Sequence, residues 1–528
     1  MKDSMPAREA RARVPEWIPV TVLYVLAHGW MLLDRGVFWD DWVYFRQPPA
    51  LLADLARQLG SIWPGWTFAI QWGSEWSVWA TRGAVFLAYL AVALMSLRLL
   101  RRVTSLDAQA RVSTAALVAV FPVMGARDAV SNSAYAFSLA LFFAGWCLLD
   151  SAVGRRRVVL RISALALLAL SLRTTSLGLF YLVIPFWLVW REGVTWRRPR
   201  ELGTALLRYA DVIALPLAFL VLRGRMFAPS GIYEGYNRLT AAGLVKALWQ
   251  IPAALYNSFV VVLARMPSSM WWPVAILATA IAVIALSRGS ERDTATRWWL
   301  VAVVGVFAFV LGVYPYLAVG KMPALPDFDS RHQLLVPFGA ALMLVGGVRG
   351  AAGFFRAPRV VSAGVLALLI GASVGVSAAG HLAYQREWYK QLGMIEALRT
   401  SAEAHIGRTF LFEERSAFLN VNGRTYKREY EYSGLFAEAF GTHQRFGPDR
   451  SEYGAHGAAF YSSRFTAPYK LDGYRAAPPD YAVLVEPGPA DLRDDRVLAR
   501  LLIAEWSGSP RLMSDAATTV HLRFEPLR

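Results

Sequence analysis

Residues 17–33 read WIPVTVLYVLAHGWMLL, an apolar run in which His28 is the only acidic or basic side chain. A helix needs roughly 20 apolar residues to cross the hydrocarbon core of a bilayer. The run is followed by Asp34, Arg35 and bulky aromatic residues, whereas a signal peptidase site requires small residues. We therefore interpret residues 17–33 as a retained transmembrane helix.

Similar apolar runs recur along most of the chain. Of its 528 residues, 56% are hydrophobic and 18% are charged, against roughly 25% charged in soluble domains. The pattern predicts a polytopic α-helical membrane protein of about 11 transmembrane helices. The predicted spans begin near Trp17, Val78, Val112, Ser133, Val158, Thr175, Leu206, Trp271, Trp298, Gln333 and Arg359. Residues 244–266 fit either an interfacial helix or a further span, and Pro252 and the lack of a basic flank favour the interface.

Arginine clusters occupy every second connection between the predicted spans. They lie near residues 98–102, 155–161, 191–200, 288–297 and 349–359. Cytoplasmic loops of membrane proteins are enriched in Lys and Arg, so this alternation predicts a cytoplasmic N-terminus. An odd number of spans then places the C-terminus outside. We expect a protein of the bacterial inner (plasma) membrane.

The composition changes near residue 381. Residues 1–380 form the predicted transmembrane module, whose first outer loop is residues 34–76, and residues 381–528 are polar without a spanning run. Strand-like pieces at 408–414, 481–487 and 518–524 alternate with helical stretches. We therefore expect a C-terminal extracytoplasmic α/β domain of ordinary size. Its segment 431–441 (EYSGLFAEAFG) is a candidate for an acceptor site, although an ordinary loop explains it equally well.

Composition also narrows the classes of function. The net charge is +17, but most arginines lie between apolar runs, which points to topology, and we expect no nucleic-acid partner. Cys147 is the only cysteine, so no disulfide forms within the chain. Metal-ligand spacing of Cys and His, a P-loop and a serine-elbow motif are absent from the sequence. ATP-driven transport and serine hydrolysis therefore have no support.

The segment GVFWDDWVYF, residues 36–45, sets Asp40 and Asp41 between Trp39 and Trp42 in the first outer loop. Ionisable side chains near a membrane interior are candidates for function. Adjacent acids buried among aromatic rings have raised, coupled pKa values, which suits a general base. The alternative is a solvated loop with an interfacial aromatic belt.

Basic residues map to several other outer span ends, where the topology rule predicts few. They are Arg127, Arg173, Lys321, Arg331 and His332. Each alone fits a snorkelling or ion-paired side chain, but together they favour a site for phosphate, which guanidinium groups bind bidentately. The chemistry expected is departure of a lipid-linked phosphate, stabilised by these cations, while an aspartate deprotonates an attacking hydroxyl. A divalent cation (Mg or Mn) held by Asp40 and Asp41 is an open option, because two acids alone do not specify one.

The chain resembles the GT-C superfamily of integral-membrane glycosyltransferases. This superfamily includes protein O-mannosyltransferases and the lipid A aminoarabinose transferase. The resemblance rests on the cytoplasmic N-terminus, the WDDW segment in the first outer loop, the number of spans and the C-terminal outer domain. It implies a polyprenyl-phosphate sugar donor and a lipid, glycan or protein acceptor in the cell envelope. It also implies an acidic base or metal ligand at Asp40 or Asp41, with Asp40 favoured as the base. The donor phosphate would be held by Arg331 and His332, with Lys321 and Arg173 next.

The resulting expectation is an inverting transfer of a sugar on the outer face, because a single base-assisted displacement needs no covalent enzyme intermediate. One alternative is an O-antigen-type polymerase or ligase, which also grips a lipid diphosphate with outer arginines. Another is a lipid-linked-saccharide flippase or transporter, which predicts charges deep within spans and paired, broken halves. A purely structural membrane protein leaves the acid pair and the outer arginines unexplained.

Overall fold

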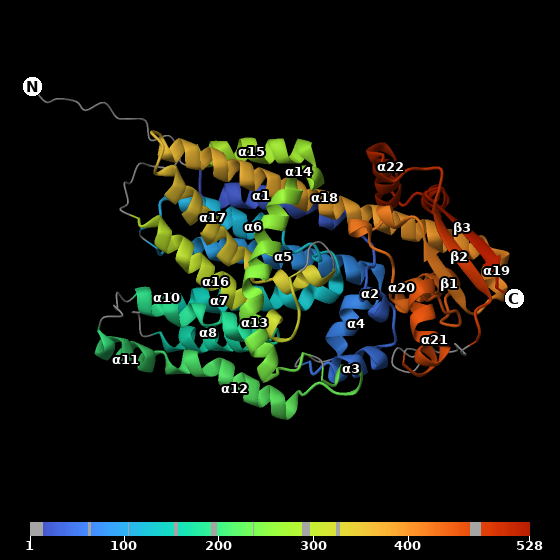
Figure 1. Ribbon diagram of the computed structural model, residues 1–528, viewed down its shortest axis with the longest axis horizontal. Helices are drawn as coiled ribbons and strands as arrows, with labels where there is room; N and C mark the ends of the chain where they lie inside the picture. Colours follow the sequence, from blue (N-terminus) through green and yellow to red (C-terminus); the bar gives the residue numbers. More distant parts are fainter. Residues whose placement is uncertain are drawn as a thin grey trace, which may run out of the picture.

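The computed structural model describes residues 14–61, 65–103, 105–152, 157–191, 198–235, 237–287, 296–323, 328–464 and 477–527. Most of the chain forms an elongated helical bundle whose helices run along the long axis of the molecule (Figure 1). The C-terminal region forms a small sheet and several helices at one end (Figure 1). Several arginines of the predicted cytoplasmic side lie outside the described residues. They are the arginines of the N-terminal segment and Arg155, Arg156, Arg197, Arg288 and Arg292.

Every predicted span contains a helix. The bundle consists of α1 (Trp17–His28) continued by η1 (Gly29–Leu33), α5 (Glu75–Leu100), α6 (Ala108–Val120), α7 (Ser133–Ala152), α8 (Val158–Ser171), α9 (Leu177–Phe180), α10 (Val183–Arg191), α11 (Pro199–Arg208), α12 (Ala210–Met226), α15 (Trp272–Ser287), α16 (Trp298–Ala318), α17 (Val336–Ala352) and α18 (Pro358–Thr400). By length and composition, five helical segments of the described chain are able to cross a membrane, or six if α11 and α12, bent by 56°, form one span. The fold is thus mostly helical with several membrane-length apolar helices, and the full number of spans stays a prediction.

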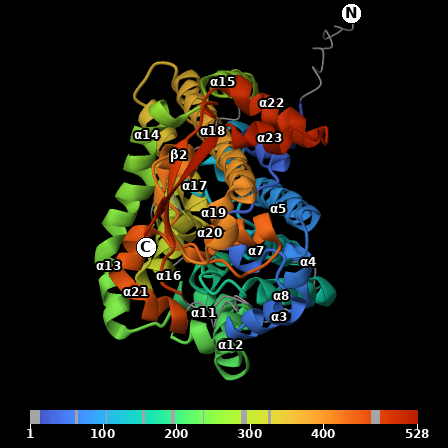
Figure 2. The same ribbon diagram turned by 90° about the vertical axis from the view of Figure 1, so that its right-hand side faces the viewer.

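Residues 241–269 form one of the five membrane-length segments. They comprise α13 (Ala241–Leu255), the π-helical turn η4 (Tyr256–Val261) and α14 (Val262–Ser269). Figures 1 and 2 show this segment running across the bundle, transverse to the long helices. Pro252 and Pro267 lie inside its helices. The segment is long and apolar enough to cross a membrane. Its interfacial position stays a prediction.

Glycines let α16 and α17 approach closely. A Cβ at Gly339 would lie 2.4 Å from the backbone nitrogen of Phe309, and one at Gly305 would lie 2.5 Å from that of Met343. Small residues at helix interfaces allow such backbone contact, which supplies packing energy where lipid provides no hydrophobic driving force. α16 and α17 therefore pack backbone against backbone, and η5 (Phe328–Gln333) lies in the connection between them.

The C-terminal region contains a mixed three-stranded sheet in the order β1 (Phe410–Glu414), β2 (Tyr481–Pro487), β3 (Val520–Pro526). β1 and β2 are parallel, whereas β2 and β3 are antiparallel. All three strands were expected from the sequence. The accompanying helices are α19 (Ala402–Ile406), α20 (Glu429–Phe440), α21 (Arg450–Arg464), α22 (Asp495–Trp506) and α23 (Leu512–Ala517).

One helix joins the two parts of the chain. α18 continues without a break from Pro358 to Thr400, so the compositional boundary at 380/381 lies inside it. Its second half is buried against the first outer loop and the C-terminal region, where Tyr384, Trp388 and Tyr389 belong to one apolar core with Trp39 and Trp42. The first outer loop and the C-terminal region therefore pack as a unit around the end of α18.

Candidate functional site

The first outer loop lies at the end of the bundle that carries the C-terminal region (Figures 1 and 2). It contains α2 (Asp41–Tyr44), α3 (Pro49–Gln58) and α4 (Trp66–Trp72). Trp39, directly before the acid pair, has a φ of 51°. A bulky residue at positive φ is a strained outlier that persists only where its surroundings hold it, and such outliers cluster at functional sites. The strain marks the WDDW segment as a site candidate.

Asp41 is fully buried, and its carboxylate accepts hydrogen bonds from the backbone of a neighbouring segment. Its Oδ2 accepts the amide N–H of Val130 at 2.9 Å, and its Oδ1 accepts that of Ser131 at 2.6 Å. These residues belong to η2 (Val130–Asn132), which leads into α7. Burial raises the pKa of Asp41 to about 6, against the lowering effect of these hydrogen bonds. Asp41 thus anchors the loop to a helix N-terminus.

Asp40 is only half-buried and faces the C-terminal region. Its Oδ1 accepts the hydroxyl of Tyr430 at 2.5 Å. Burial and the neighbouring charge of Asp40 raise the pKa of Tyr430 well above its usual value, so the phenol is a neutral donor. Of the two acids, only Asp40 has an oxygen without a hydrogen-bond partner among the described residues, and this oxygen is available for a reacting proton.

Two of the predicted phosphate ligands, Arg331 and His332, lie within η5 (Phe328–Gln333), and the charge of Lys321 acts on His332. The Arg331 guanidinium lies 3.7 Å from the centroid of the Phe328 ring. His332 is buried, and neither of its ring nitrogens has a hydrogen-bond partner among the described residues. Burial, Arg331 and Lys321 lower the pKa of His332 to about 3. The Asp329 carboxylate lies 3.6 Å from Arg331 Nη2 and 3.8 Å from His332 Nδ1, so one anionic side chain already lies beside this cationic segment. A neutral imidazole here is suited to donate a hydrogen bond to a further anion.

Aromatic contacts bring the cations next to the acid loop. The rings of Trp39 and Phe328 lie 5.0 Å apart, which joins the WDDW segment to η5. Arg173, in the turn between α8 and α9, lies 5.9 Å from the ring centroid of Phe68 in α4, and burial lowers its pKa to about 10. Two separate cationic segments therefore flank the first outer loop.

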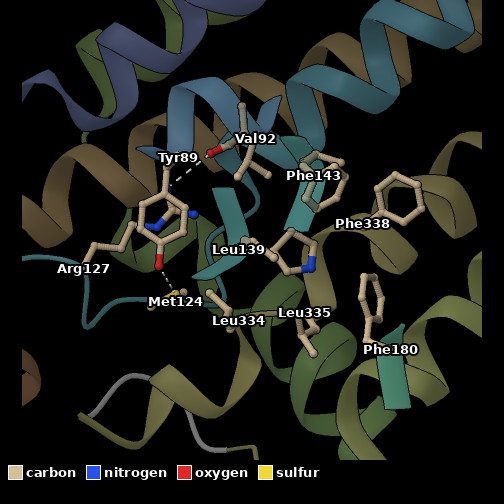
Figure 3. Close-up of a pocket in the computed structure, with 13 residues that line it drawn as sticks. Tyr89, Val92, Met124, Arg127, Leu139, Phe143, Phe180, Leu334, Leu335 and Phe338 are labelled. Atoms are coloured by element: carbon tan, nitrogen blue, oxygen red, sulfur yellow. Dashed lines mark hydrogen bonds between the residues drawn. The ribbon is translucent and has the colours of Figure 1, made fainter. Parts of the chain in front are cut away.

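Arg127 takes a different position from the other predicted phosphate ligands. Its guanidinium lies 4.5 Å from the Tyr89 ring centroid, and its Nη1 is 3.0 Å from His28 Nε2. It faces an apolar pocket between the helices, with Phe143, Phe180 and Phe338 on the far side (Figure 3). Arg127 thus belongs to the interior of the bundle.

Arg127 belongs to a buried cluster of polar side chains that leads through two histidines back to Asp128, the next residue in the sequence. His28 Nδ1 lies 2.9 Å from His381 Nε2, and His381 Nδ1 lies 2.7 Å from Asp128 Oδ2. These residues join α1, α18 and the connection after α6. His28 and His381 are separated by 353 positions in the sequence, so no local pattern predicts the pairing.

The residues do not fit a metal site built from the acid pair. Among the described residues, no group of three or more His, Cys, Asp or Glu side chains is arranged to hold a metal ion. Both Asp41 oxygens already accept backbone N–H groups, and one Asp40 oxygen accepts the Tyr430 hydroxyl. The acid pair is therefore a candidate for proton transfer and not for binding Mg or Mn.

The sequence did not point to the basic and acidic residues of the C-terminal region that reach the site. Arg424 lies 5.1 Å from the Trp39 ring centroid and pairs with Glu387 of α18 at 2.6 Å and with Glu431 at 2.7 Å. The only available signal was the density of alternating charged and aromatic residues at 424–432.

Comparisons with protein-family models, with curated proteins and with solved structures found no match to this chain.

Proposed function

We propose that the protein is a membrane glycosyltransferase that moves a sugar from a polyprenyl-phosphate donor to a lipid, glycan or protein acceptor. The reaction takes place at the end of the bundle that carries the first outer loop and the C-terminal region, on the outer face of the membrane. The observation that supports the proposal is the 5.0 Å contact between the Trp39 and Phe328 rings, which joins the segment that carries Asp40 to the segment that carries Arg331 and His332.

The arrangement supports a single displacement with inversion. Asp40 takes the proton of the acceptor hydroxyl, whose oxygen forms a bond to the anomeric carbon of the sugar. The bond between that carbon and the phosphate oxygen breaks, and its electron pair stays on the phosphate. Arg331, His332 and Arg173 stabilise the charge that develops there. The apolar helix surfaces hold the polyprenyl chain in the surrounding lipid.

A transfer assay in membranes tests this proposal. Radiolabelled polyprenyl-phosphate sugars are supplied to wild type, Asp40→Asn and Asp41→Asn, and label is followed into a larger product. Asp40→Asn should lower turnover by about 10²–10⁴-fold, the usual contribution of a general base, with donor binding retained. Near-normal turnover of this variant would remove Asp40 as the base. Absence of transfer from every donor by folded wild type would defeat the glycosyltransferase proposal.

A flippase or transporter of lipid-linked saccharides is the second candidate function. It is favoured by the buried polar cluster of Arg127, His28, His381 and Asp128, because ionisable groups inside a membrane bundle often serve proton-coupled transport. A lipid-linked saccharide flipped across vesicles by wild type, but not by His381→Leu, would support this candidate. If His381→Leu keeps sugar transfer, the buried polar cluster is not needed for the transfer reaction, and the two functions can be measured separately.

A further inference from the structure

We propose that α20 of the C-terminal region positions Asp40 for the reaction, with Tyr430 as the positioning residue. The C-terminal region is then part of the active site and not only a platform for the acceptor. This inference rests on the proposed function for its chemistry, but the contacts that carry it are independent of the identity of the donor.

One face of α20 contacts successive residues of the acid loop. Tyr430, Gly434 and Glu438 are spaced by four residues, so they lie on one side of the helix. They meet Asp40, Trp42 and Arg46 in the same order. Three contacts along one face of a helix fix the position of the loop more closely than a single hydrogen bond does.

The central contact allows no space for a side chain on the helix. A Cβ at Gly434 would lie 2.5 Å from Cε3 and 2.8 Å from Cδ2 of the Trp42 ring. Real Cβ atoms do not approach ring atoms so closely, so the indole lies directly on the backbone of α20. Glycine at this position sets the distance between α20 and the loop.

The outer contacts fix the two ends of the acid segment. Tyr430 donates its hydroxyl to Asp40 Oδ1 at 2.5 Å. The Arg46 Nη1 lies 2.8 Å and 3.0 Å from the carboxylate oxygens of Glu438, and its Nη2 lies 3.0 Å from Glu75. With Oδ1 held by Tyr430, Oδ2 of Asp40 is the oxygen directed to an acceptor hydroxyl.

The strained backbone of the loop explains why such a clamp is needed. Trp39 at φ 51° and Arg46 at φ 55° flank the acid pair. Residues in this region of φ persist only where neighbouring structure holds them. Arg424 over the Trp39 ring, itself held by Glu387 and Glu431, adds a further restraint from the C-terminal region. Loss of α20 contacts should therefore release the loop.

The first measurement is limited trypsin digestion of the full-length protein in lipid nanodiscs. Gly434→Ala inserts a methyl group against Trp42 and should raise the rate of cleavage after Arg46 and Arg57 by about tenfold or more, the effect of losing on the order of 1.4 kcal/mol of docking. The matched control is Gly454→Ala in α21, where an added Cβ meets nothing within 4 Å. Equal cleavage rates in wild type, Gly434→Ala and Gly454→Ala would overturn the inference.

The second measurement separates positioning from mere stability. Tyr430→Phe keeps the ring and removes the hydroxyl, so kcat of sugar transfer should fall about tenfold to a hundredfold with KM for the donor unchanged. Tyr426→Phe removes a buried hydroxyl bonded to Gln391 instead and serves as the control. A wild-type kcat in Tyr430→Phe would overturn the positioning role. If wild type transfers no sugar, the glycosyltransferase proposal fails, and the trypsin result alone decides whether α20 fixes the loop.

Discussion

The Asp41 carboxylate lies 2.6 Å from the backbone nitrogen of Ser131, at the start of the helical segment that leads into α7. Its other oxygen accepts the N–H of Val130, so the side chain satisfies two backbone donors that the helix itself leaves without partners. Two adjacent acids thus have different surroundings. Asp41 holds the loop to the bundle, whereas Asp40 faces the C-terminal region.

Asp41 gives the stability of the protein a specific pH dependence. Burial raises its folded-state pKa to about 6, above its ordinary value of 3.8. The folded state therefore binds the proton more tightly than the unfolded state, so the contribution of Asp41 to stability is fully present below about pH 4 and is lost as the pH rises to about 6. The difference amounts to on the order of 3 kcal/mol. Thermal unfolding midpoints across this range should fall in wild type relative to Asp41→Asn.

The control for this prediction is Asp495→Asn, a change at an exposed carboxylate of α22. This variant should keep the wild-type pH dependence. If wild type and Asp41→Asn show parallel midpoints from pH 4 to pH 6, Asp41 does not titrate in this range.

Arg331→Ala should weaken binding of a polyprenyl phosphate. The guanidinium lies over Phe328 beside the buried His332, where water screens it poorly. Loss of a charge-assisted hydrogen bond to phosphate should raise Kd by about tenfold to a hundredfold. Binding of labelled lipid phosphate to the protein in nanodiscs measures this, with the exposed Arg493→Ala as the control. An unchanged Kd would exclude Arg331 from the phosphate site.

The sequence predicted the local structure better than the contacts between distant segments. The strands β1 to β3 follow from short apolar runs, and each predicted span contains a helix. The continuation of α18 past residue 380 was not predicted, because the sequence changes from apolar to polar directly after Gly380. The helix continues since its polar half gains a new core, formed by Tyr384, Trp388 and the C-terminal strands.

The site was predicted only where its residues share a short segment. Asp40 with Asp41, and Arg331 with His332, are neighbours in sequence. The Tyr430 hydroxyl reaches Asp40 across 390 positions, and the Arg127 guanidinium lies inside the bundle, with its Nη1 3.0 Å from Nε2 of His28 in α1. Such pairings depend on how whole helices pack, which no periodicity along the chain encodes.

Gly339→Ala should destabilise the bundle. The added methyl group would meet the backbone of Phe309 at 2.4 Å and force α16 and α17 apart. Overpacking of this kind costs about 1–3 kcal/mol, so the thermal unfolding midpoint should fall. Gly347→Ala in the same helix is the matched control, because its Cβ meets nothing within 4 Å. Equal midpoints in the two variants would show that the helix contact is looser than the structure indicates.

The two ends of α18 should lie on opposite sides of the membrane. Its 43 residues span about 65 Å at 1.5 Å per residue, more than twice the roughly 30 Å of the hydrocarbon core. The turn before it contains the exposed Phe354 and Arg356, and Arg359 lies in the first turn of the helix. These two basic residues favour the cytoplasm. A periplasm-dependent reporter fused after Arg528 should be active, and the same reporter fused after Phe354 should be inactive. The reverse result would place the acid loop and its cations in the cytoplasm, where the proposed transfer on the outer face is impossible.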